Sequence, residues 1–383
     1  MRTEKIGSMS EAIREDEVSA SLLEEAHRSA GAQFEERDGR VLPASYGDVI
    51  AEYESVRASD GAGVIDLSGR GQIEVTGAEA EQFLNGLITN DVKTLKDGAW
   101  MNAAFPTVQG RLIAFARVLR RDGRFLFDTE AATRGKVLKA LERFTLAGDF
   151  HVSDLSDETA VISVQGARSV EIIGAVLGQE AANVERERVF TANWNEREVT
   201  VIRATHTAED GFDLFVNSAG AVSLWENLNA RGARPVGFDA LEILRIEAGE
   251  PRYGADMDET NVVLEIGRDD AVSFTKGCYV GQEIIARIHW RGHVAKRLAG
   301  LMVDGATQRG DKIRNSEARE IGRITSAAFS PLLQKTIALG LVKYDYLGPG
   351  TEVKILSEET EHAAHVAELP FVRGGWYGAE RSE

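Results

Sequence analysis

Residues 276–283 read Lys-Gly-Cys-Tyr-Val-Gly-Gln-Glu and contain the single cysteine of the chain. They form a glycine-flanked loop that opens a predicted helix, whose apolar positions continue to Ile288. Cys278 is therefore expected just before a helix N-terminus, with Lys276 beside it. The positive end of the helix dipole and the ammonium group both favour the thiolate over the thiol. A lone cysteine is often a small buried hydrophobe, but the polar flanks and the two glycines favour a reactive role.

A basic run follows this loop. No acidic residue occurs in positions 284–303, which hold four cations, Arg287, Arg291, Lys296 and Arg297. The chain as a whole has a net charge of −17, which disfavours non-specific binding to nucleic acid. The basic run could bind an anionic ligand, or it could pair with acids elsewhere in the fold.

Metal chemistry within one chain is not favoured. A single cysteine excludes a four-cysteine site and a self-contained iron–sulfur cluster. His289 and His293 have the spacing of a helical metal pair, but Gly292 argues against a helix through both. We therefore assign no metal site.

An internal duplication provides the elements that must position these residues. Strand-to-helix patterns occur in the order 73–87 and 123–144, and again in the order 162–177 and 211–228. The glycine turns of the copies are 89 residues apart at Gly77 and Gly166, and 88 apart at Gly123 and Gly211. Two pairs at nearly one offset predict two similar α+β units.

The pattern changes after Arg297. Five strand patterns follow without a convincing helix, at residues 298–303, 319–325, 337–343, 351–356 and 364–369. They predict a small C-terminal β-barrel or sandwich. We divide the chain into an N-terminal extension that is helical or partly disordered (1–43), a first α+β unit (44–155), a second unit with the cysteine loop (156–290), and the barrel (291–383).

Composition sets the compartment that we expect. No apolar run approaches the roughly 18 residues of a membrane span. The first forty residues have no apolar signal core and are rich in acids, unlike a secretory signal or a transit peptide. A cytoplasmic protein without a membrane partner is the prediction.

The 276–283 motif matches the Lys-Gly-Cys-aromatic-x-Gly-Gln-Glu signature of the YgfZ family, which is related to the glycine-cleavage T-proteins and to mitochondrial iron–sulfur assembly homologues. The matched positions are Lys276, Gly277, Cys278, Tyr279, Gly281, Gln282 and Glu283. Residues 87–92 resemble the "LTNDV" segment of both groups, residues 108–111 the "QGR" turn of the YgfZ branch, and residues 244–249 the "LRLEAG" helix of T-proteins. The resemblance implies two ferredoxin-like units and a β-barrel around a central folate channel.

The resemblance also implies ligand-binding residues for tetrahydrofolate. Thr207 to Phe212 resembles the "TGEDGF" stretch, which makes Glu209 the match for a pterin-binding carboxylate. Arg245 matches a folate-contacting arginine, and Asn90 lies in the "LTNDV" match. Arg291 could meet the glutamate tail of a folate. A surface turn carboxylate and a helix-surface ion pair are the alternatives for Glu209 and Arg245.

One departure separates the chain from the transferases. T-proteins place two aspartates shortly after their "GG" turn, where this chain has Ala114 and Phe115. A group that handles protons is absent there. The resemblance thus implies a folate-binding accessory protein that supports iron–sulfur cluster assembly or repair and, through it, tRNA modification. Cys278 would be a nucleophile or a cluster ligand shared with a partner. The alternatives are a tetrahydrofolate-dependent aminomethyl or one-carbon transferase or demethylase, and a scaffold that uses no folate.

Overall fold

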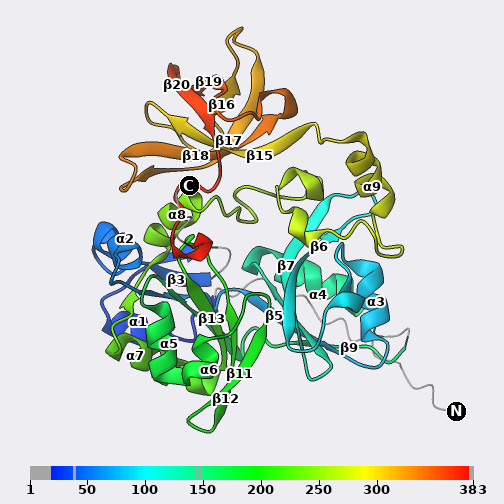
Figure 1. The fold of residues 1–383 in the computed structure, drawn as a ribbon, viewed down its shortest axis with the longest axis vertical. Helices are drawn as coiled ribbons and strands as arrows, with labels where there is room; N and C mark the ends of the chain where they lie inside the picture. The colour runs from blue at the N-terminus through cyan, green and yellow to red at the C-terminus, as the bar shows by residue number, and fades with distance from the viewer. Residues whose placement is uncertain (1–18, 38–39, 144, 146–147, 379–383) are drawn as a thin grey trace, which may run out of the picture.

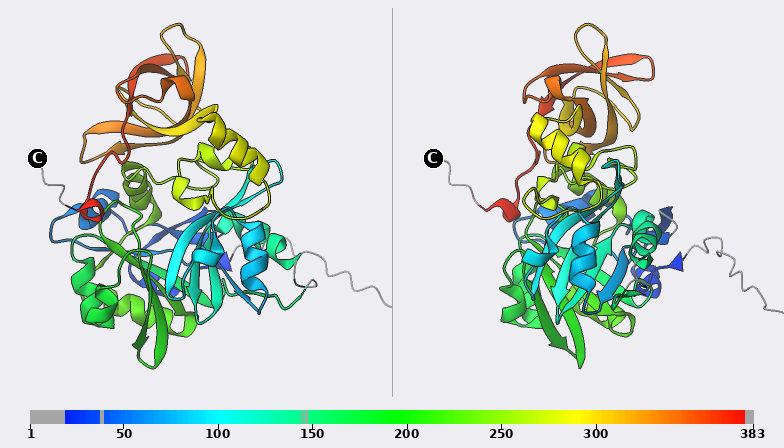
Figure 2. Two further views of the ribbon diagram at one scale, coloured as in Figure 1. Left: turned by 45° about the vertical axis from the view of Figure 1, so that its right-hand side comes forward. Right: turned by 90° about the vertical axis from the view of Figure 1, so that its right-hand side faces the viewer.

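The computed structural model describes residues 19–37, 40–143, 145 and 148–378. Two β-sheets stand side by side, and a barrel lies at one end above them, as Figures 1 and 2 show. The first part of the predicted N-terminal extension, residues 1–18, lies outside the described residues.

The first sheet has five strands in the order β6-β7-β8-β5-β9. Their bounds are β5 Gly71–Thr76, β6 Ala99–Pro106, β7 Leu112–Arg121, β8 Arg124–Thr129 and β9 His151–Asp154. Helices α3 (Ala80–Leu87) and α4 (Arg134–Glu142) bury their apolar faces against the sheet in one core. Without the edge strand β6, this order is that of a ferredoxin-like unit.

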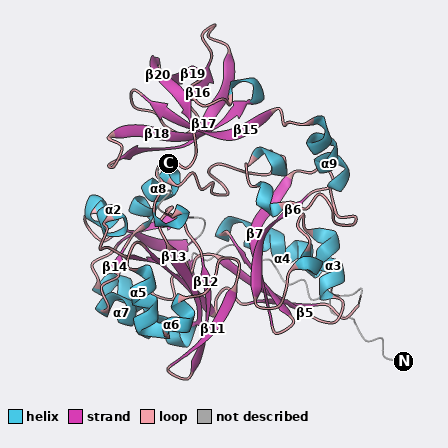
Figure 3. Cartoon of the chain, viewed as in Figure 1, coloured by secondary structure: helices cyan, strands magenta, loops and turns pink. Residues whose placement is uncertain are grey.

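The second sheet has six strands in the order β11-β12-β13-β10-β4-β14. Their bounds are β4 Gly63–Asp66, β10 Thr159–Gln165, β11 Val189–Trp194, β12 Arg197–Arg203, β13 Gly211–Asn217 and β14 Arg234–Pro235. Helices α5 (Ser169–Leu177), α6 (Gln179–Ala182) and α7 (Ser218–Ala230) share its core. Figure 3 shows these helices on one flank of the molecule and α3 on the other. The predicted duplication is confirmed.

Strand β4 belongs to the second sheet although it lies before the first sheet in sequence. It pairs antiparallel with β10 from Ile162↔Asp66 to Gln165↔Gly63. It thereby fills the position next to β10 that a fourth strand takes in a ferredoxin-like unit. The second sheet thus contains residues from outside segment 156–290, and the boundaries at 43, 155 and 290 stay predictions.

A third, small sheet packs beside the second. It has the order β1-β3-β2, with β1 Ser19–Ala20, β2 Gln33–Arg37 and β3 Arg40–Ser45. Helices α1 (Glu24–Ser29) and α2 (Val49–Arg57) flank β2 and β3 in sequence. The carboxylate of Asp48 caps α2 by accepting from the N–H groups of Ile50 and Ala51, each at 3.0 Å.

The predicted C-terminal barrel is confirmed as a closed barrel of six strands in the order β15-β18-β17-β16-β19-β20. Their bounds are β15 Lys296–Val303, β16 Lys312–Arg314, β17 Glu320–Ser330, β18 Lys335–Lys343, β19 Glu352–Ser357 and β20 Thr360–Ala367. The three-residue strand β16 is the one that the sequence pattern missed. Aliphatic side chains fill the interior.

Two more helices connect the sheets to the barrel. Helix α8 (Phe238–Glu247) packs against α2, β3 and β17, whereas α9 (Gln282–Arg291) lies at the outer edge of the molecule in Figure 1. In the described ranges, no helix combines the length and the apolar character needed to cross a bilayer.

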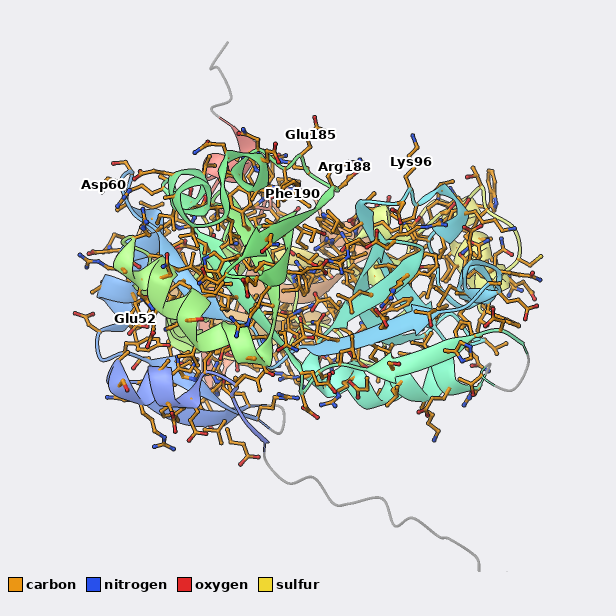
Figure 4. The ribbon with its side chains drawn as sticks, turned by 90° about the horizontal axis from the view of Figure 1, so that it is seen from below. Glu52, Asp60, Lys96, Glu185, Arg188 and Phe190 are labelled. Carbon is orange, nitrogen blue, oxygen red and sulfur yellow. The ribbon has the colours of Figure 1, made fainter. Side chains whose placement is uncertain are left out.

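The two large sheets meet along a short backbone bridge. The N–H of Trp100 donates to the carbonyl of Glu187 at 2.9 Å, and the N–H of Val189 donates to that of Gly98 at 2.9 Å. In Figure 4 the side chains of Arg188 and Lys96 project from the face where this bridge lies. The bridge fixes one wall of the space between the sheets.

Candidate functional site

A cavity of about 430 Å³ lies between the two sheets. Its lining comes from both sheets, from β2 and β3, from α8, from the segment between α8 and α9, and from the C-terminal tail at Trp376. The described barrel strands contribute no lining residue. The cavity therefore lies between the two sheets, and the identity of this cavity with the folate channel that the resemblance implied stays a prediction.

The lining is rich in cations and aromatic rings. Seven arginines line it against four acids, although the chain is strongly acidic overall. The arginines are Arg37, Arg70, Arg117, Arg186, Arg245, Arg252 and Arg268, and the acids are Glu130, Glu187, Glu250 and Asp270. Trp100, Phe115, Phe238 and Trp376 supply aromatic surface. An anionic aromatic ligand suits such a lining.

A chain of alternating charges crosses between the sheets along one wall of the cavity. In order it contains Glu130, Arg70, Asp128, Arg117, Asp213 and His206. Arg70 donates to Glu130 at 2.7 Å and to Asp128 at 2.8 Å, and Arg117 donates to Asp128 at 2.7 Å. Arg117 on β7 also bonds Asp213 on β13, so its guanidinium joins the first sheet to the second.

Burial and ion pairing have opposite effects on the carboxyl pKa values in this chain of charges. Asp128 and Asp213 are fully buried, which by itself raises a carboxyl pKa. The neighbouring groups outweigh burial. Arg117 and Arg70 hold the pKa of Asp128 below its ordinary value, and His206 and Arg117 do the same for Asp213. Both carboxylates are therefore ionised at neutral pH.

Strand β7 decides which side chains face the cavity. Its side chains alternate, so Ala114 and Ala116 enter the core under the first sheet, whereas Phe115 and Arg117 face the cavity. The guanidinium of Arg268 lies 5.3 Å from the centre of the Phe115 ring. A carboxylate at position 115 would have faced the ligand space, and the phenyl ring occupies that place.

The C-terminal tail closes one side of the cavity. The N–H of Trp376 donates to the carbonyl of Ala208 at 3.1 Å, and the guanidinium of Arg186 lies 4.0 Å from the Trp376 ring centre. The N–H of Gly375 donates to the Glu209 carboxylate at 2.8 Å. Arg57 donates to the same carboxylate at 2.8 Å.

Of the predicted ligand residues, Arg245 alone is in the cavity wall. Glu209 does not line the cavity and instead anchors the tail. Arg245 is buried and saturated by Glu242, Asp256, Ser326 and the Glu250 carbonyl. The Asn90 amide donates to the carbonyls of Asn102 at 2.8 Å and Asp270 at 3.0 Å. Arg291 is exposed at the end of α9, outside the cavity.

The cysteine motif also lies outside the cavity lining. Cys278 is exposed in the loop before α9. Lys276 does not present a free ammonium beside the thiol, because its Nζ donates to the carbonyls of Ile88 at 2.9 Å and Asn90 at 2.5 Å. Burial lowers the pKa of Lys276 to about 8, and burial raises the pKa of Tyr279 to about 12. Lys276 thus fastens the motif to the "LTNDV" segment.

The remaining motif residues form the helix start. Gly281 caps α9 with a φ of +78°. A Cβ there would lie 2.4 Å from the carbonyl oxygen of Thr107, which precedes the "QGR" turn, and 3.3 Å from the Cα of Gly110 within that turn. Gln282 reaches the carbonyl of Gly277 at 3.5 Å, and Glu283 pairs with Arg287 one turn further on, at 2.6 Å. The two glycine turns quoted for the resemblance therefore pack against each other.

Gly281→Ala is expected to destabilise the protein by more than about 2 kcal/mol. The left-handed backbone costs an alanine about 1–2 kcal/mol, and the clash with Thr107 adds to that cost. Gly277→Ala is the matched control, because a Cβ at Gly277 meets nothing within 4 Å. Urea unfolding of the two variants measures the difference, and equal stabilities would contradict this account.

Three residues of the site escaped sequence reasoning. Arg117, His206 and Asp213 come from two different units, and no short motif joins them. The signal that was present is the alternation of β7, which puts Phe115 and Arg117 on one face, opposite Ala114. Within the described ranges, no group of three or more His, Cys, Asp or Glu side chains is placed to hold a metal.

Two family models match the chain in order. The GCVT N-terminal domain matches residues 23–276, and the glycine cleavage T-protein C-terminal barrel domain matches residues 296–373. The crystal structure of glycine cleavage system aminomethyltransferase T from Bartonella henselae superposes with a TM-score of 0.86 at 24% identity, covering 93% of this chain and 99% of that one. The overall arrangement is therefore the T-protein fold.

Proteins of similar sequence indicate the same family as the structural comparison. The aminomethyltransferase of Rubrobacter xylanophilus is 33% identical over 356 residues, covering 92% of this chain and 93% of the relative. That of Thermoanaerobacter pseudethanolicus is 30% identical over 351 residues, covering 89% and 94%. The chain belongs to the GCVT family, that of the glycine-cleavage T-proteins.

Proposed function

We propose that the protein binds tetrahydrofolate in the central cavity and acts on a one-carbon unit there, as a tetrahydrofolate-dependent transferase. The observation that carries the proposal is the lining, which sets arginines and aromatic rings around a cavity in an acidic protein. A folate joins a flat pterin and a benzoyl ring to a glutamate with two carboxylates. The rings suit Trp100, Phe115 and Trp376, and a carboxylate suits Arg186, whose guanidinium contacts the ring and the carbonyl of Trp376.

The family relatives support this proposal over the accessory role. Both relatives described above are named aminomethyltransferases and align along nearly their whole length. In this chain, however, Phe115 replaces a carboxylate that the resemblance implied. The glycine-cleavage reaction itself is thus not the one-carbon reaction we expect.

A second candidate is the iron–sulfur accessory role of the YgfZ branch. The observation that favours it is the exposure of Cys278, which leaves the thiol open to a partner protein rather than to the cavity. The match of residues 276–283 to the YgfZ signature also supports it. In this role the partners are iron–sulfur assembly or client proteins, and the protein binds tetrahydrofolate.

Tetrahydrofolate is expected to quench the fluorescence of the purified protein in a saturable manner. The chain has five tryptophans, of which Trp100 and Trp376 line the cavity and Trp290 is 83% exposed elsewhere. The double variant Trp100→Phe/Trp376→Phe should lose most of the response, and Trp290→Phe should keep it. Calorimetry on the same samples reports binding independently, and no heat of binding in the wild type would contradict the proposal.

Turnover separates the two candidates. The purified protein is incubated with tetrahydrofolate and with one-carbon donors, including an aminomethyl donor. Formation of a one-carbon-substituted folate supports the transferase, and binding without any such product supports the accessory role.

A further inference from the structure

The groups that line the cavity differ in what a change of pH does to them. The seven arginines keep their protons throughout the range in which proteins are stable. The four acids are carboxylates, which are far weaker bases than imidazole. Among the residues that line the cavity, His206 is the one whose side-chain type changes charge near neutral pH.

The geometry around His206 fixes its ring. Its Nε2 lies 2.9 and 3.1 Å from the two carboxylate oxygens of Asp213. Its backbone N–H donates to the Gln165 side chain at 3.1 Å, and the next residue but one, Ala208, has a φ of +67°. About a fifth of the His206 side chain is exposed, at 22%, whereas Asp213 is fully buried. The ring is therefore held from behind and open toward the cavity.

The carboxylate sets the tautomer. Asp213 is ionised, so the neutral ring donates its Nε2 hydrogen to it, and Nδ1 is left with a lone pair. In the described part of the chain, no hydrogen bond engages this Nδ1. When Nδ1 gains a proton, the imidazolium stays beside the Asp213 anion, which stabilises it.

Other charges act on the same ring. Arg117 on β7 shares the Asp213 carboxylate, with Asp128 and Arg70 behind it. Arg186 and Glu187, which precede β11, line the same cavity with opposite signs. Gln165 on β10 is neutral. Within the part of the chain that the structure describes, Asp213 is the one anion that directly contacts the ring.

We propose that His206 exchanges a proton with the ligand in the central cavity, and that Asp213 is its positioning residue. The inference rests on the proposed function, because it takes the ligand to be a folate. A proton on a ring nitrogen of the ligand passes to Nδ1, whose lone pair forms the new N–H bond. The electron pair of the broken bond stays on the ligand, and the return of the proton restores the neutral ring. His206 thereby supplies the proton-handling group that Phe115 lacks.

The test is a histidine titration on the full-length protein. The chain has seven histidines, so the Cε1–H signals of 13C-labelled histidine are resolvable, and the His206 signal is the one lost in His206→Gln. We expect tetrahydrofolate to move the titration midpoint of this signal by about half a pH unit or more, equal to about a threefold change in proton affinity. In Asp213→Asn the midpoint of the ligand-free protein should fall, because the anion is gone.

The affinity for tetrahydrofolate provides the second measurement. It should change about threefold or more between pH 5.5 and 8.5 in the wild type and follow a flatter profile in His206→Gln. Glutamine still donates to Asp213 but cannot titrate, so it separates proton exchange from packing. His293→Gln is the control, because His293 stacks on Tyr344 outside the cavity. Binding with an unmoved His206 signal, or with equal pH profiles in wild type and His206→Gln, overturns this role alone. No binding in the wild type overturns the proposed function and this role together.

Discussion

Replacing Arg117 by methionine is expected to lower the free energy of unfolding by about 3–5 kcal/mol. The guanidinium is buried and bridges two fully buried carboxylates, Asp128 and Asp213. Methionine keeps much of the volume but leaves both carboxylates short of a countercharge. Arg70 and His206 remain as single partners. Denaturant unfolding monitored by circular dichroism measures the loss.

The effect of pH on the stability lost in Arg117→Met provides a second test, and its direction follows from the carboxyl pKa values. The pKa values of Asp128 and Asp213 are lowered in the folded protein, so the unfolded chain takes up protons first as the pH falls. The stabilisation is present above about pH 4 and is lost below it. The difference in the free energy of unfolding between the wild type and Arg117→Met should therefore become smaller in acid. Arg319→Met is the control, since Arg319 is 79% exposed and pairs only with exposed Glu317 in the described residues. If Arg117→Met lowers the free energy of unfolding by less than about 1 kcal/mol, the charge chain does not stabilise the contact between the two sheets.

Arg245→Met is expected to cost a similar amount, about 3–5 kcal/mol, and to loosen the barrel. The guanidinium ties α8 to Asp256 and to the Ser326 hydroxyl on β17, which are both buried. Hydrogen exchange of residues 320–330 should accelerate along with the loss of stability. Arg245→Lys should recover only part of it, because an ammonium cannot reproduce the planar fork.

Arg231→Met is the control for Arg245→Met. It replaces an exposed arginine after α7 and should change the free energy of unfolding by less than about 0.5 kcal/mol. If Arg245→Met leaves stability intact and weakens only tetrahydrofolate binding, the predicted role as a folate contact is correct, and the structural role described above is wrong.

Local patterns predicted the architecture well because local residues create it. The strand-to-helix repeats with glycine turns at Gly77 and Gly166 lead to β5, α3, β10 and α5 as predicted. The strand β4 was invisible to the same reasoning. Its four residues are buried and short, and their partner β10 begins 93 residues later at Thr159, with nothing local to specify the pairing.

The site was harder to predict because side-chain direction is decided by tertiary contacts. Lys276 stands next but one to Cys278 in sequence, yet its ammonium turns inward to two backbone carbonyls. Glu209 lies in a motif-like stretch, yet the C-terminal tail engages it. Arg117 and Asp213 pair across 96 residues. A single sequence does not carry that information.

The position of Trp376 has a consequence for how the protein is made. The cavity lining begins at Arg37 and ends at Trp376, which bonds the backbone at Ala208. On the ribosome, Trp376 emerges after every other residue of the cavity lining. Strand β4 must likewise wait for β10 before it is paired. A nascent chain stalled after the second sheet therefore lacks the parts of the cavity wall that come from α8, from the segment after α8 and from Trp376.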